Sequence, residues 1–350
     1  MERTLTYSQA IREAMHQEMT RDPSVFVMGM GVDDPTLIYG TSKGLVDEFG
    51  PDRVVDTPIA EDAMTGMAIG AALGGMRPIH VHIRMDFILL AMNQLINMAA
   101  KMKYMYGGSV SVPIVVRGII GRSWGQGPQH SQGLHSLFMH IPGLKIIAPV
   151  TPYDAKGCLI ESIRDNNPVI FIEHRMLHGL ESHVPEEPYT VPFGSARVLE
   201  NGSDVTIVGI SYAVVECLRA RRYLDEVGIS AEVIDPVTLS PLDIGTIITS
   251  VRKTGRLLVV DNAWTNCGAS AEIVTQVIEQ LQGDMKVQVG RMGYEPVTCP
   301  TTRELEDLFY PNGRTIASSA HSMCTGGAKG KIWVPVGEDA AEITGFRGPF

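Results

Sequence analysis

The sequence lacks the features of several large protein classes. Its 350 residues include 29 Lys or Arg against 39 Asp or Glu, a net charge of −10, so there is no basic excess to neutralise nucleic-acid phosphates. No apolar run approaches the roughly 20 residues that a membrane helix needs; the best stretch is 87–92. The amino terminus shows no basic start followed by an apolar core, which argues against a secretory signal. We therefore expect neither a nucleic-acid nor a membrane partner.

Cysteine is scarce and scattered. No two of the cysteines form a Cys-x-x-Cys pair, a spacing that favours neither a zinc site nor a disulfide framework. Free thiols suit a reducing compartment, so we expect a cytoplasmic protein. With 44% hydrophobic and 19% charged residues, the composition is that of a globular chain rather than a disordered one or a coiled coil. The five cysteines are Cys158, Cys217, Cys267, Cys299 and Cys324.

Apolar β-type runs alternate with longer amphipathic segments, which predicts an α/β fold with largely parallel sheets. Thr6 and Gln9 form a capping box before one predicted helix, and Thr151 followed by Pro152 begins another. An apolar helix is predicted over 87–105. Strands are predicted at 25–28, 78–83, 112–117, 145–148 and 169–173, and again at 205–210, 231–234, 256–260 and 286–289.

A short polar stretch rich in proline, 181–194, separates the two series of strands and helices. Such a segment sustains neither a helix nor a central strand, so it predicts a boundary. Each series is expected to form a doubly wound domain. Residues beyond about Ser319 are rich in glycine and weakly patterned. We expect a first domain over 1–185, a linker over 186–200, a second domain over 201–335 and a tail over 336–350.

Several catalytic motifs are missing. There is no phosphate-binding Gly-x-x-x-x-Gly-Lys-Ser/Thr, no Gly-x-Ser-x-Gly elbow and no His-Glu-x-x-His. No Gly-x-Gly-x-x-Gly follows a predicted strand, which argues against an NAD enzyme. The remaining candidates lie between Asp56 and His130.

The first candidate is the segment from Asp56 to Glu61, between the strand-like 53–55 and a helix of small residues. Carboxylates at the carboxyl end of a strand are where α/β proteins place active groups, although an ordinary first-turn acid fits equally well. The second is the glycine-rich loop 121–131, which carries His130. It could bind a ligand, or its histidine could simply be solvated.

The third candidate is a run of alternating polar residues that ends near Asp86. Alternation places His80, His82 and Arg84 on one face of a predicted strand. Two histidines on one face could ligate a metal, but no third ligand is evident nearby. Structural or surface roles, and anion binding by Arg84 with the histidines, stay open.

Eight segments, ordered along nearly the whole chain, carry a family resemblance. They resemble the β subunit of the thiamine-diphosphate-dependent decarboxylase component of 2-oxo acid dehydrogenase complexes (pyruvate, branched-chain and acetoin types), in the transketolase-like group. The segments are 56–61 (Asp-Thr-Pro-Ile-Ala-Glu), 94–101, 104–108 (Tyr-Met-Tyr-Gly-Gly), 129–132 (Gln-His-Ser-Gln), 140–145, 151–157, 164–169 and 233–239.

The resemblance implies a transketolase-like pyrimidine-binding domain followed by a transketolase C-terminal-type domain, with thiamine diphosphate as cofactor. It implies that Glu61 hydrogen-bonds the aminopyrimidine ring, a catalytic role, and that Ile59 and Phe87 help bind that ring. His130 matches the catalytic histidine that serves the covalent intermediate and the acceptor step. With His130, the residues His82 and Arg84 are candidate substrate contacts.

Some relatives also hold a structural potassium ion, mostly through backbone oxygens. The aligned positions are Ile114, Ser162, Ile163, Asp165 and Asn167. The resemblance therefore implies a K⁺ site at these residues.

One expected motif is missing from the chain. A thiamine diphosphate site needs a module that binds Mg²⁺ and the diphosphate, typically a Gly-Asp-Gly; the nearest sequence here is 283–285, Gly-Asp-Met. The chain thus resembles half of an active site. The expected partner is an α subunit that brings Mg²⁺ and the diphosphate site, in an α₂β₂ heterotetramer, with a lipoyl acyltransferase as a further candidate partner.

Alternative functions stay open because the surroundings of the site differ from the family. Relatives commonly carry a glutamate where this chain has Val81, between His80 and His82. The leading hypothesis is decarboxylation of a 2-oxo acid with transfer of the acyl unit to a lipoyl or other acceptor. A split transketolase-like enzyme would instead transfer a two-carbon ketol unit from a ketose phosphate, which would suit an arginine and histidine cluster. A catalytically silent scaffold is the third possibility.

Overall fold

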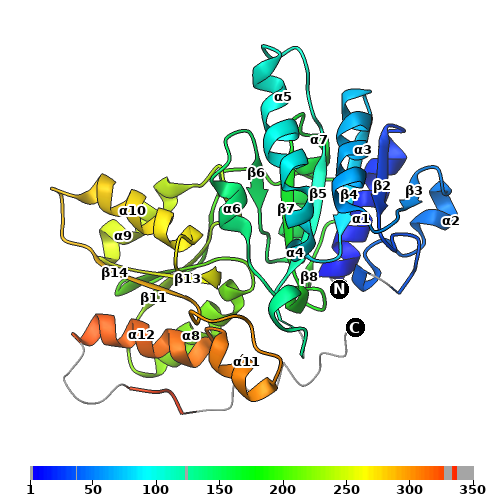
Figure 1. Ribbon diagram of the computed structural model, residues 1–350. Helices are drawn as coiled ribbons and strands as arrows, with labels where there is room; N and C mark the ends of the chain where they lie inside the picture. Colours follow the sequence, from blue (N-terminus) through cyan, green and yellow to red (C-terminus); the bar gives the residue numbers. More distant parts are fainter. Residues whose placement is uncertain (1–2, 37, 123–124, 327–332, 337–350) are drawn as a thin grey trace. The chain divides into compact units, whose positions relative to one another are not determined.

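The computed structural model (Figure 1) describes residues 3–36, 38–122, 125–326 and 333–336, which form two compact units. Described residues up to 122, together with 129–193, make up the first unit. The second consists of 125–128 and the described residues from 194 onward. Both units are α/β, as the sequence predicts.

The first unit is built on parallel strands. Along the sheet they run β6, β7, β5, β4, β2, β3, and every neighbouring pair in this order is parallel. All six residues of β5 and of β7 are buried, as expected for strands covered on both faces. The bounds are β2 Val25–Gly29, β3 Val54–Asp56, β4 Arg77–His82, β5 Val115–Ile120, β6 Lys145–Ile147 and β7 Val169–His174.

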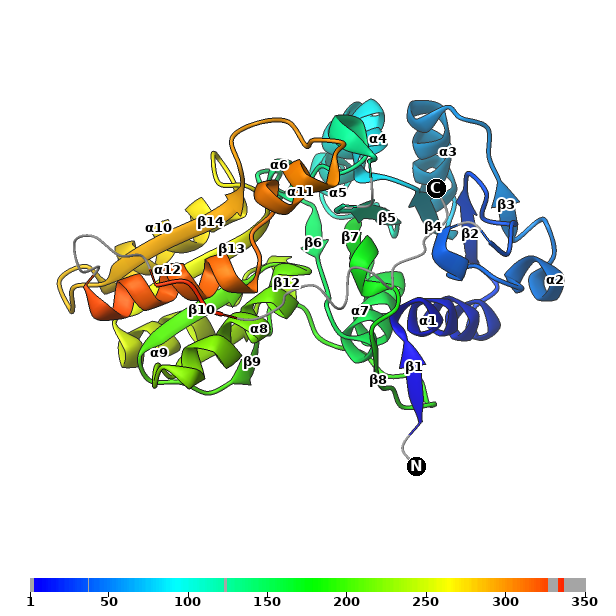
Figure 2. The ribbon, with the colours of Figure 1, turned by 90° about the horizontal axis from the view of Figure 1, so that it is seen from below.

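Helices cover both faces of this sheet. Figure 2 shows α1 and α7 side by side on one face, and α3, α4 and α5 on the other. A separate antiparallel pair joins β1 (Thr4–Thr6) to β8 (Glu181–His183). The helices are α1 Tyr7–Arg21, α2 Leu45–Phe49, α3 Glu61–Leu73, α4 Met85–Ile88, α5 Ala100–Met105, α6 His135–Met139 and α7 Pro152–Arg164.

The helix starts follow the sequence signals. Thr6 caps α1 and forms the expected capping box with Gln9, and the Thr151 hydroxyl accepts from the Asp154 amide at the start of α7. The helix expected over 87–105 is interrupted instead: α4 passes through a 3₁₀ turn and a π-helical segment, Gln94–Ala99, before α5. The strand expected over 112–117 begins only at Val115, because Pro113 has no N–H for the ladder.

The second unit holds a five-stranded sheet in the order β14, β13, β10, β11, β9, in which only β9 is antiparallel. Its strands are β9 Arg197–Glu200, β10 Val205–Gly209, β11 Ala231–Asp235, β13 Arg256–Trp264 and β14 Gln288–Tyr294, with β12 at Thr238–Ser240. Its helices are α8 Ala213–Glu226, α9 Ile244–Thr254, α10 Ala269–Leu281, α11 Arg303–Phe309 and α12 Gly313–Thr325.

The chain between the two sheets differs from the linker expected over 186–200. Lys156 of α7 donates to the main-chain oxygens of 185–187, and Tyr189 donates to the Tyr153 carbonyl. These contacts bind the proline-rich stretch to the first unit, which extends to Phe193. Arg197–Glu200 is then the edge strand β9. The sequence pattern predicted neither the packing of the proline-rich stretch on the first unit nor the edge strand β9, because neither needs a long apolar run.

The weak pattern beyond Ser319 also conceals structure. Helix α12 continues to Thr325 and buries Ile316, Ala317, Ala320 and Met323. Two of these four side chains are alanines, so the helical period is present but faint. The tail expected over 336–350 lies outside the described residues except for Val336.

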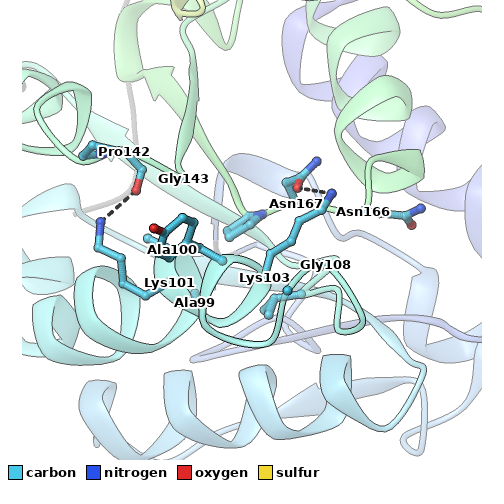
Figure 3. A pocket seen from close by; sticks show the side chains of 13 residues that line it. Ala99, Ala100, Lys101, Lys103, Gly108, Pro142, Gly143, Asn166 and Asn167 are labelled. Carbon is cyan, nitrogen blue, oxygen red and sulfur yellow. Dashed lines mark hydrogen bonds between the residues drawn. The ribbon is translucent and has the colours of Figure 1, made fainter.

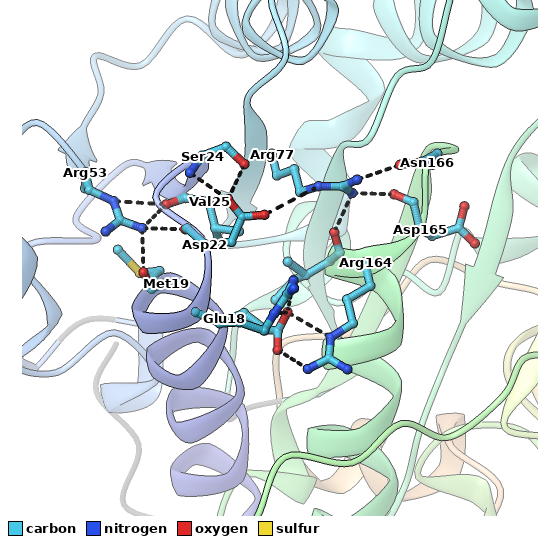
Figure 4. A network of polar contacts seen from close by, with 12 residues as sticks. Glu18, Met19, Asp22, Ser24, Val25, Arg53, Arg77, Arg164, Asp165 and Asn166 are labelled. Carbon is cyan, nitrogen blue, oxygen red and sulfur yellow. Dashed lines mark hydrogen bonds and ion pairs between the residues drawn. The ribbon is translucent and has the colours of Figure 1, made fainter.

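A polar network closes the edge of the first sheet at which the strands begin (Figure 4). We call Glu18, Asp22, Arg53, Arg77 and Arg164 the amino-edge network. Glu18, fully buried, accepts two hydrogen bonds from Arg164, at 2.6 and 3.0 Å. Each of these five side chains has a partner. Arg53 donates to the carbonyl oxygens of Met19, Asp22 and Val25, and Arg77 donates to those of Ile163 and Asp165 and to Asn166 Oδ1.

Candidate active site

The opposite edge of the first sheet, where the strands end, carries a small pocket of about 30 Å³. Segments after β2 and β3 and around the end of β4 build it, which is the position that parallel α/β sheets use for ligands. Three residues expected to contact the cofactor line it together: Ile59, Glu61 and Phe87. The full lining is Met30, Thr57, Pro58, Ile59, Ala60, Glu61, Met64, His80, Val81, His82, Ile83 and Phe87.

Glu61 is the first residue of α3 and is only partly buried. No hydrogen bond or ion pair holds its carboxylate anywhere in the part of the chain that the structure describes. The neighbouring Ile59 is 77% exposed, large for an isoleucine. A free acceptor beside uncovered apolar surface is an arrangement suited to a ligand or partner rather than to a folded core.

His130 lies close to this pocket, because its ring contacts that of Phe87, which lines the pocket. The two rings meet edge to face, with centroids 5.4 Å apart and planes at 85°. His130 comes from the glycine-rich loop after β5, which leaves the strand at Gly121. Gly121 has a φ of +91°, and a Cβ there would lie 2.0 Å from His174 Nε2, so glycine alone fits. The structure therefore brings together two residues that the sequence separates by more than forty positions.

His80 and His82 share one face of β4, as expected from the alternation. Their rings lie 4.3 Å apart, and His80 Nε2 is 3.1 Å from the Thr65 hydroxyl. Burial lowers the pKa of His80 to about 4 and lowers the pKa of His82 well below its usual value. Both histidines are therefore neutral near pH 7. His82 Nε2 is buried and has no hydrogen-bond partner among the described residues.

Arg84 is not among the residues that line the pocket. It is buried at the start of α4, donates to the Ile83 carbonyl at 2.7 Å and interacts with Tyr39. Burial lowers the pKa of Arg84, and Tyr39 partly offsets this effect. Tyr39 in turn stacks on His178, with centroids 4.4 Å apart. Arg84 thus interacts with Tyr39 and does not line the pocket to which His80 and His82 contribute.

The Tyr39 stack belongs to a buried ionic network that our sequence reasoning missed. His178 Nε2 lies 3.1 Å from Glu173 Oε2, and Glu173 pairs with Arg117 through two hydrogen bonds of 2.6 and 2.9 Å. Despite the burial of Glu173, the Arg117 guanidinium holds its pKa at about 2. Arg117 also donates to Thr41, in the same loop as Tyr39. A signal for this network exists in the sequence: two charged residues interrupt otherwise apolar strands.

The residues expected to bind K⁺ gather at the end of α7 and at the strand starts. Ile163 and Asp165 direct their carbonyl oxygens at Arg77. The Asp165 carboxylate pairs with Lys145 and accepts from Asn167. The Ser162 hydroxyl donates to the Cys158 carbonyl. The Ile114 carbonyl accepts from the Val169 amide.

A second pocket, larger than the first, is lined by none of the catalytic candidates (Figure 3). It has a volume of about 720 Å³ and is formed by the stretches 99–112, 142–143 and 166–168, all near segments that carry the family resemblance. Lys101 donates to the Pro142 carbonyl at 2.8 Å and Lys103 to the Asn167 side chain at 2.9 Å across it. Neither Glu61 nor His130 lines it. Its size alone therefore does not make it the reaction site.

Two negative findings apply to the described residues. They contain no helix long and apolar enough to cross a membrane. Nor do they contain any group of three or more His, Cys, Asp or Glu side chains that could hold a metal ion.

Comparison with known proteins identifies both units and the whole chain. Residues 3–179 match the transketolase pyrimidine-binding domain, and residues 194–316 match the transketolase C-terminal domain. A solved structure described as a split-gene transketolase, an inactive β₄ tetramer, has the same fold with a TM-score of 0.74 at 19% identity, covering 92% of this chain and 98% of that one.

Curated relatives are more similar in sequence. The β subunit of acetoin:2,6-dichlorophenolindophenol oxidoreductase from Cupriavidus necator is 44% identical, over 93% of this chain and 99% of the relative. The corresponding subunit from Bacillus subtilis is 40% identical over 91% and 96%. The pyruvate dehydrogenase E1 component subunit β of Rickettsia bellii is 41% identical over 91% and 98%. The chain therefore belongs to the family of 2-oxo acid dehydrogenase E1 β subunits, built from transketolase-type pyrimidine-binding and C-terminal domains, as its resemblance predicts.

Proposed function

We propose that this chain supplies the pyrimidine half of a thiamine diphosphate site and is catalytically active only with an α subunit that carries Mg²⁺ and the diphosphate. The α₂β₂ assembly, the lipoyl acyltransferase as acyl acceptor, and the cytoplasmic location belong to the same proposal. The observation that carries it is the grouping of Glu61, Ile59 and Phe87 in one pocket where the strands end.

The pocket fits the aminopyrimidine ring in chemistry. The Glu61 carboxylate is an available acceptor, and Phe87 offers an aromatic surface beside the apolar side chains of Met30 and Met64. At about 30 Å³ the pocket in this chain holds only a fraction of the volume of a typical small-molecule site. A site shared with a second subunit accounts for that size.

Thiamine diphosphate, when bound, supplies the electron sink for cleaving the bond next to a carbonyl group. Glu61 accepts a hydrogen bond from the pyrimidine ring. This bond determines which nitrogen atoms of that ring carry protons. Phe87 packs against the ring and fixes its plane. His130, set edge-on against Phe87, presents an imidazole that can hold or move a proton at a substrate or acceptor oxygen.

The same pocket disfavours a ketose phosphate. None of the described residues lining it is Lys or Arg. Its two histidines, His80 and His82, are uncharged because burial lowers the pKa of each, and Arg84 interacts with Tyr39 elsewhere. A sugar phosphate would find no Lys or Arg among the described residues that line this pocket. Among substrates, acetoin and pyruvate are favoured by the names of the relatives, and His82 Nε2 is a candidate hydrogen-bonding group for them.

The test is turnover by the chain co-produced with its α subunit and loaded with thiamine diphosphate and Mg²⁺. Acetoin, pyruvate, branched-chain 2-oxo acids and a ketose phosphate are offered in parallel, with dichlorophenolindophenol as electron acceptor. The proposal expects dye reduction with acetoin or an oxo acid, and none without the α subunit. Ketol transfer from the ketose phosphate in its place, or full activity of the β chain alone, would contradict it.

The K⁺ site is a separate part of the proposal. Hard cations prefer oxygen ligands. Each carbonyl oxygen has a second lone pair, so the oxygens of Ile163 and Asp165 can bind K⁺ while they also accept from Arg77. Thermal unfolding of the complex in KCl against NaCl and choline chloride tests this. A midpoint raised by K⁺ alone supports the site, and identical midpoints reject it.

A further inference from the structure

Asp86 connects the two elements that carry Phe87 and His130. Its side chain is buried, 7% exposed, in the first turn of α4. Asp86 Oδ1 accepts two hydrogen bonds from one residue: Gln132 Nε2 at 2.8 Å and the Gln132 main-chain nitrogen at 3.4 Å. Gln132 follows His130 by two positions. A single carboxylate oxygen therefore fixes both the main chain and the side chain of the loop next to the histidine.

This contact works together with the aromatic pair. Phe87 is adjacent to Asp86 in α4 and meets the His130 ring edge to face. The loop is held to the same helix a third time, because the Leu134 amide donates to Met85 Sδ at 3.4 Å. Three consecutive residues of one helix thus hold the loop at His130 and at the residues two and four positions after it. Loops are otherwise less accurate supports for reacting groups than helices or strands.

The carboxylate is costly in this position, which argues that it is more than a filler. Asp86 Oδ2 is buried and has no hydrogen-bond partner among the described residues, and the hydroxyl of the fully buried Ser131 has none either. Buried polar atoms without partners cost stability, and native proteins keep few of them. Each such atom in a native protein calls for an explanation, and a role in a functional site is one.

We propose that Asp86 is a positioning residue that, through Gln132, sets the orientation of the His130 imidazole against Phe87. Asp86 itself does not line the pocket that Glu61 and Phe87 share. The inference rests on the proposed role of His130 in the reaction and deepens it. It names the group that fixes the position of the His130 imidazole, although this residue lies in a loop.

The test reverses donor and acceptor. Gln132→Glu replaces the donating amide by a second carboxylate facing Asp86, and Asp86→Asn combined with Gln132→Glu restores one donor and one acceptor. Gln282→Glu is the control, since it makes the same amide-to-carboxylate change at an exposed residue outside the loop that carries His130. All are measured in the reconstituted complex with its α subunit.

We expect Gln132→Glu to lower kcat about 100-fold, as displacement of a reacting group by about 1 Å does, with KM and cofactor affinity little changed. The double variant should recover to within about tenfold of the wild type, the coupling expected of residues in direct contact. The control should keep its activity. A folded double variant as slow as Gln132→Glu, or a loss that falls on KM rather than kcat, would overturn the proposal.

A second readout does not depend on turnover. The rate at which diethyl pyrocarbonate modifies His130 is followed by peptide mass spectrometry in the full chain. Release of the loop by Gln132→Glu should change that rate several-fold, and the double variant should return it toward the wild-type value. If the wild-type complex turned over no substrate, the proposed function would fail, yet unchanged modification rates would still separately reject the positioning role.

Discussion

The two edges of the first sheet use polar side chains in opposite ways. At the edge where the strands begin, each member of the amino-edge network has partners, and Glu18 has two arginines, Arg21 and Arg164. At the edge where they end, Glu61 has no partner among the described residues, and His82 Nε2 and Asp86 Oδ2 are buried without one. The same sheet thus has one saturated edge and one unsaturated edge.

This difference separates stability from function. A polar group that is already paired inside the fold contributes to holding the fold and has little left to offer a ligand. One that is left unpaired costs stability, so its retention needs another reason. Variants at the two edges should therefore fail in different assays, and three predictions, ordered by size, test that separation.

The largest effect is expected from Glu61→Gln. Loss of the carboxylate should lower kcat by about 10²- to 10⁴-fold, the usual contribution of a positioned acid or base. Since no folded-state contact of Glu61 is lost, the free energy of unfolding should change by less than about 0.5 kcal/mol. Turnover in the αβ complex and urea unfolding measure the two quantities.

Asp62→Asn is the matched control for Glu61→Gln. Asp62 occupies the next position of α3, is exposed and does not line the pocket. It should keep both activity and stability. Equal losses of activity in the two variants would mean that the helix start, rather than Glu61, matters.

The next effect is a pH dependence of stability that comes from the buried histidines of β4. The folded pKa of His80 is about 4, below its ordinary value of 6.5, so between these values the unfolded state binds the proton and the folded state does not. Stability is therefore unaffected above pH 6.5 and lost as the pH falls toward 4, by up to about 3 kcal/mol for this one residue.

Unfolding free energies of the wild type and His80→Gln between pH 7 and 4 check this prediction. The variant should show a shallower decline, and His82 and His174, whose pKa values burial also lowers, should contribute to the decline that persists. At the saturated edge, the loss of stability begins at a lower pH, because a carboxyl group titrates there instead of a histidine. The hydrogen bond from Ser24 holds the pKa of Asp22 below 3.8, so its share of stability is present above 3.8 and lost below. Parallel curves for the two proteins would refute the assignment to His80.

A smaller effect is expected at the saturated edge. Glu18→Ala removes the buried carboxylate but leaves Arg21 and Arg164 partly exposed to water, so the free energy of unfolding should fall by about 2 kcal/mol. The kcat of the folded complex should stay within about twofold, because this edge is not expected to touch the substrate. Glu48→Ala, which removes an exposed partner of His16, is the control and should change little.

Local sequence signals predicted the fold better than the site. Thr6 and Thr151 cap helices through residues three positions away, so their role is readable from the sequence itself. Pro113 shows that an apolar run alone does not locate the start of a strand. Because proline lacks an N–H, the strand begins later than hydrophobicity alone predicts. Helix α12 and strand β9 were hidden because small or polar residues weaken the periodic signal.

Long-range contacts account for what the sequence could not predict about the site. Arg84 was grouped with His80 and His82 by spacing, yet β4 ends at His82 and Arg84 meets Tyr39 instead. The pairing of Arg117 with Glu173 depends on β5 and β7 being neighbours, which only the sheet order shows. The grouping of Ile59, Glu61 and Phe87 was expected from the family resemblance, and the pocket now places these residues together, while their roles remain proposals.

The measurement that tests the separation of the two edges most directly compares Glu61→Gln with Glu18→Gln in the same reconstituted complex. Both replace a carboxylate by an amide of the same shape, and both are scored for kcat and for the midpoint of thermal unfolding. The account predicts a crossed result: Glu61→Gln loses turnover and keeps its midpoint, and Glu18→Gln loses midpoint and keeps turnover. If Glu61→Gln retained wild-type turnover, or if both variants lost the same property, the account would be contradicted.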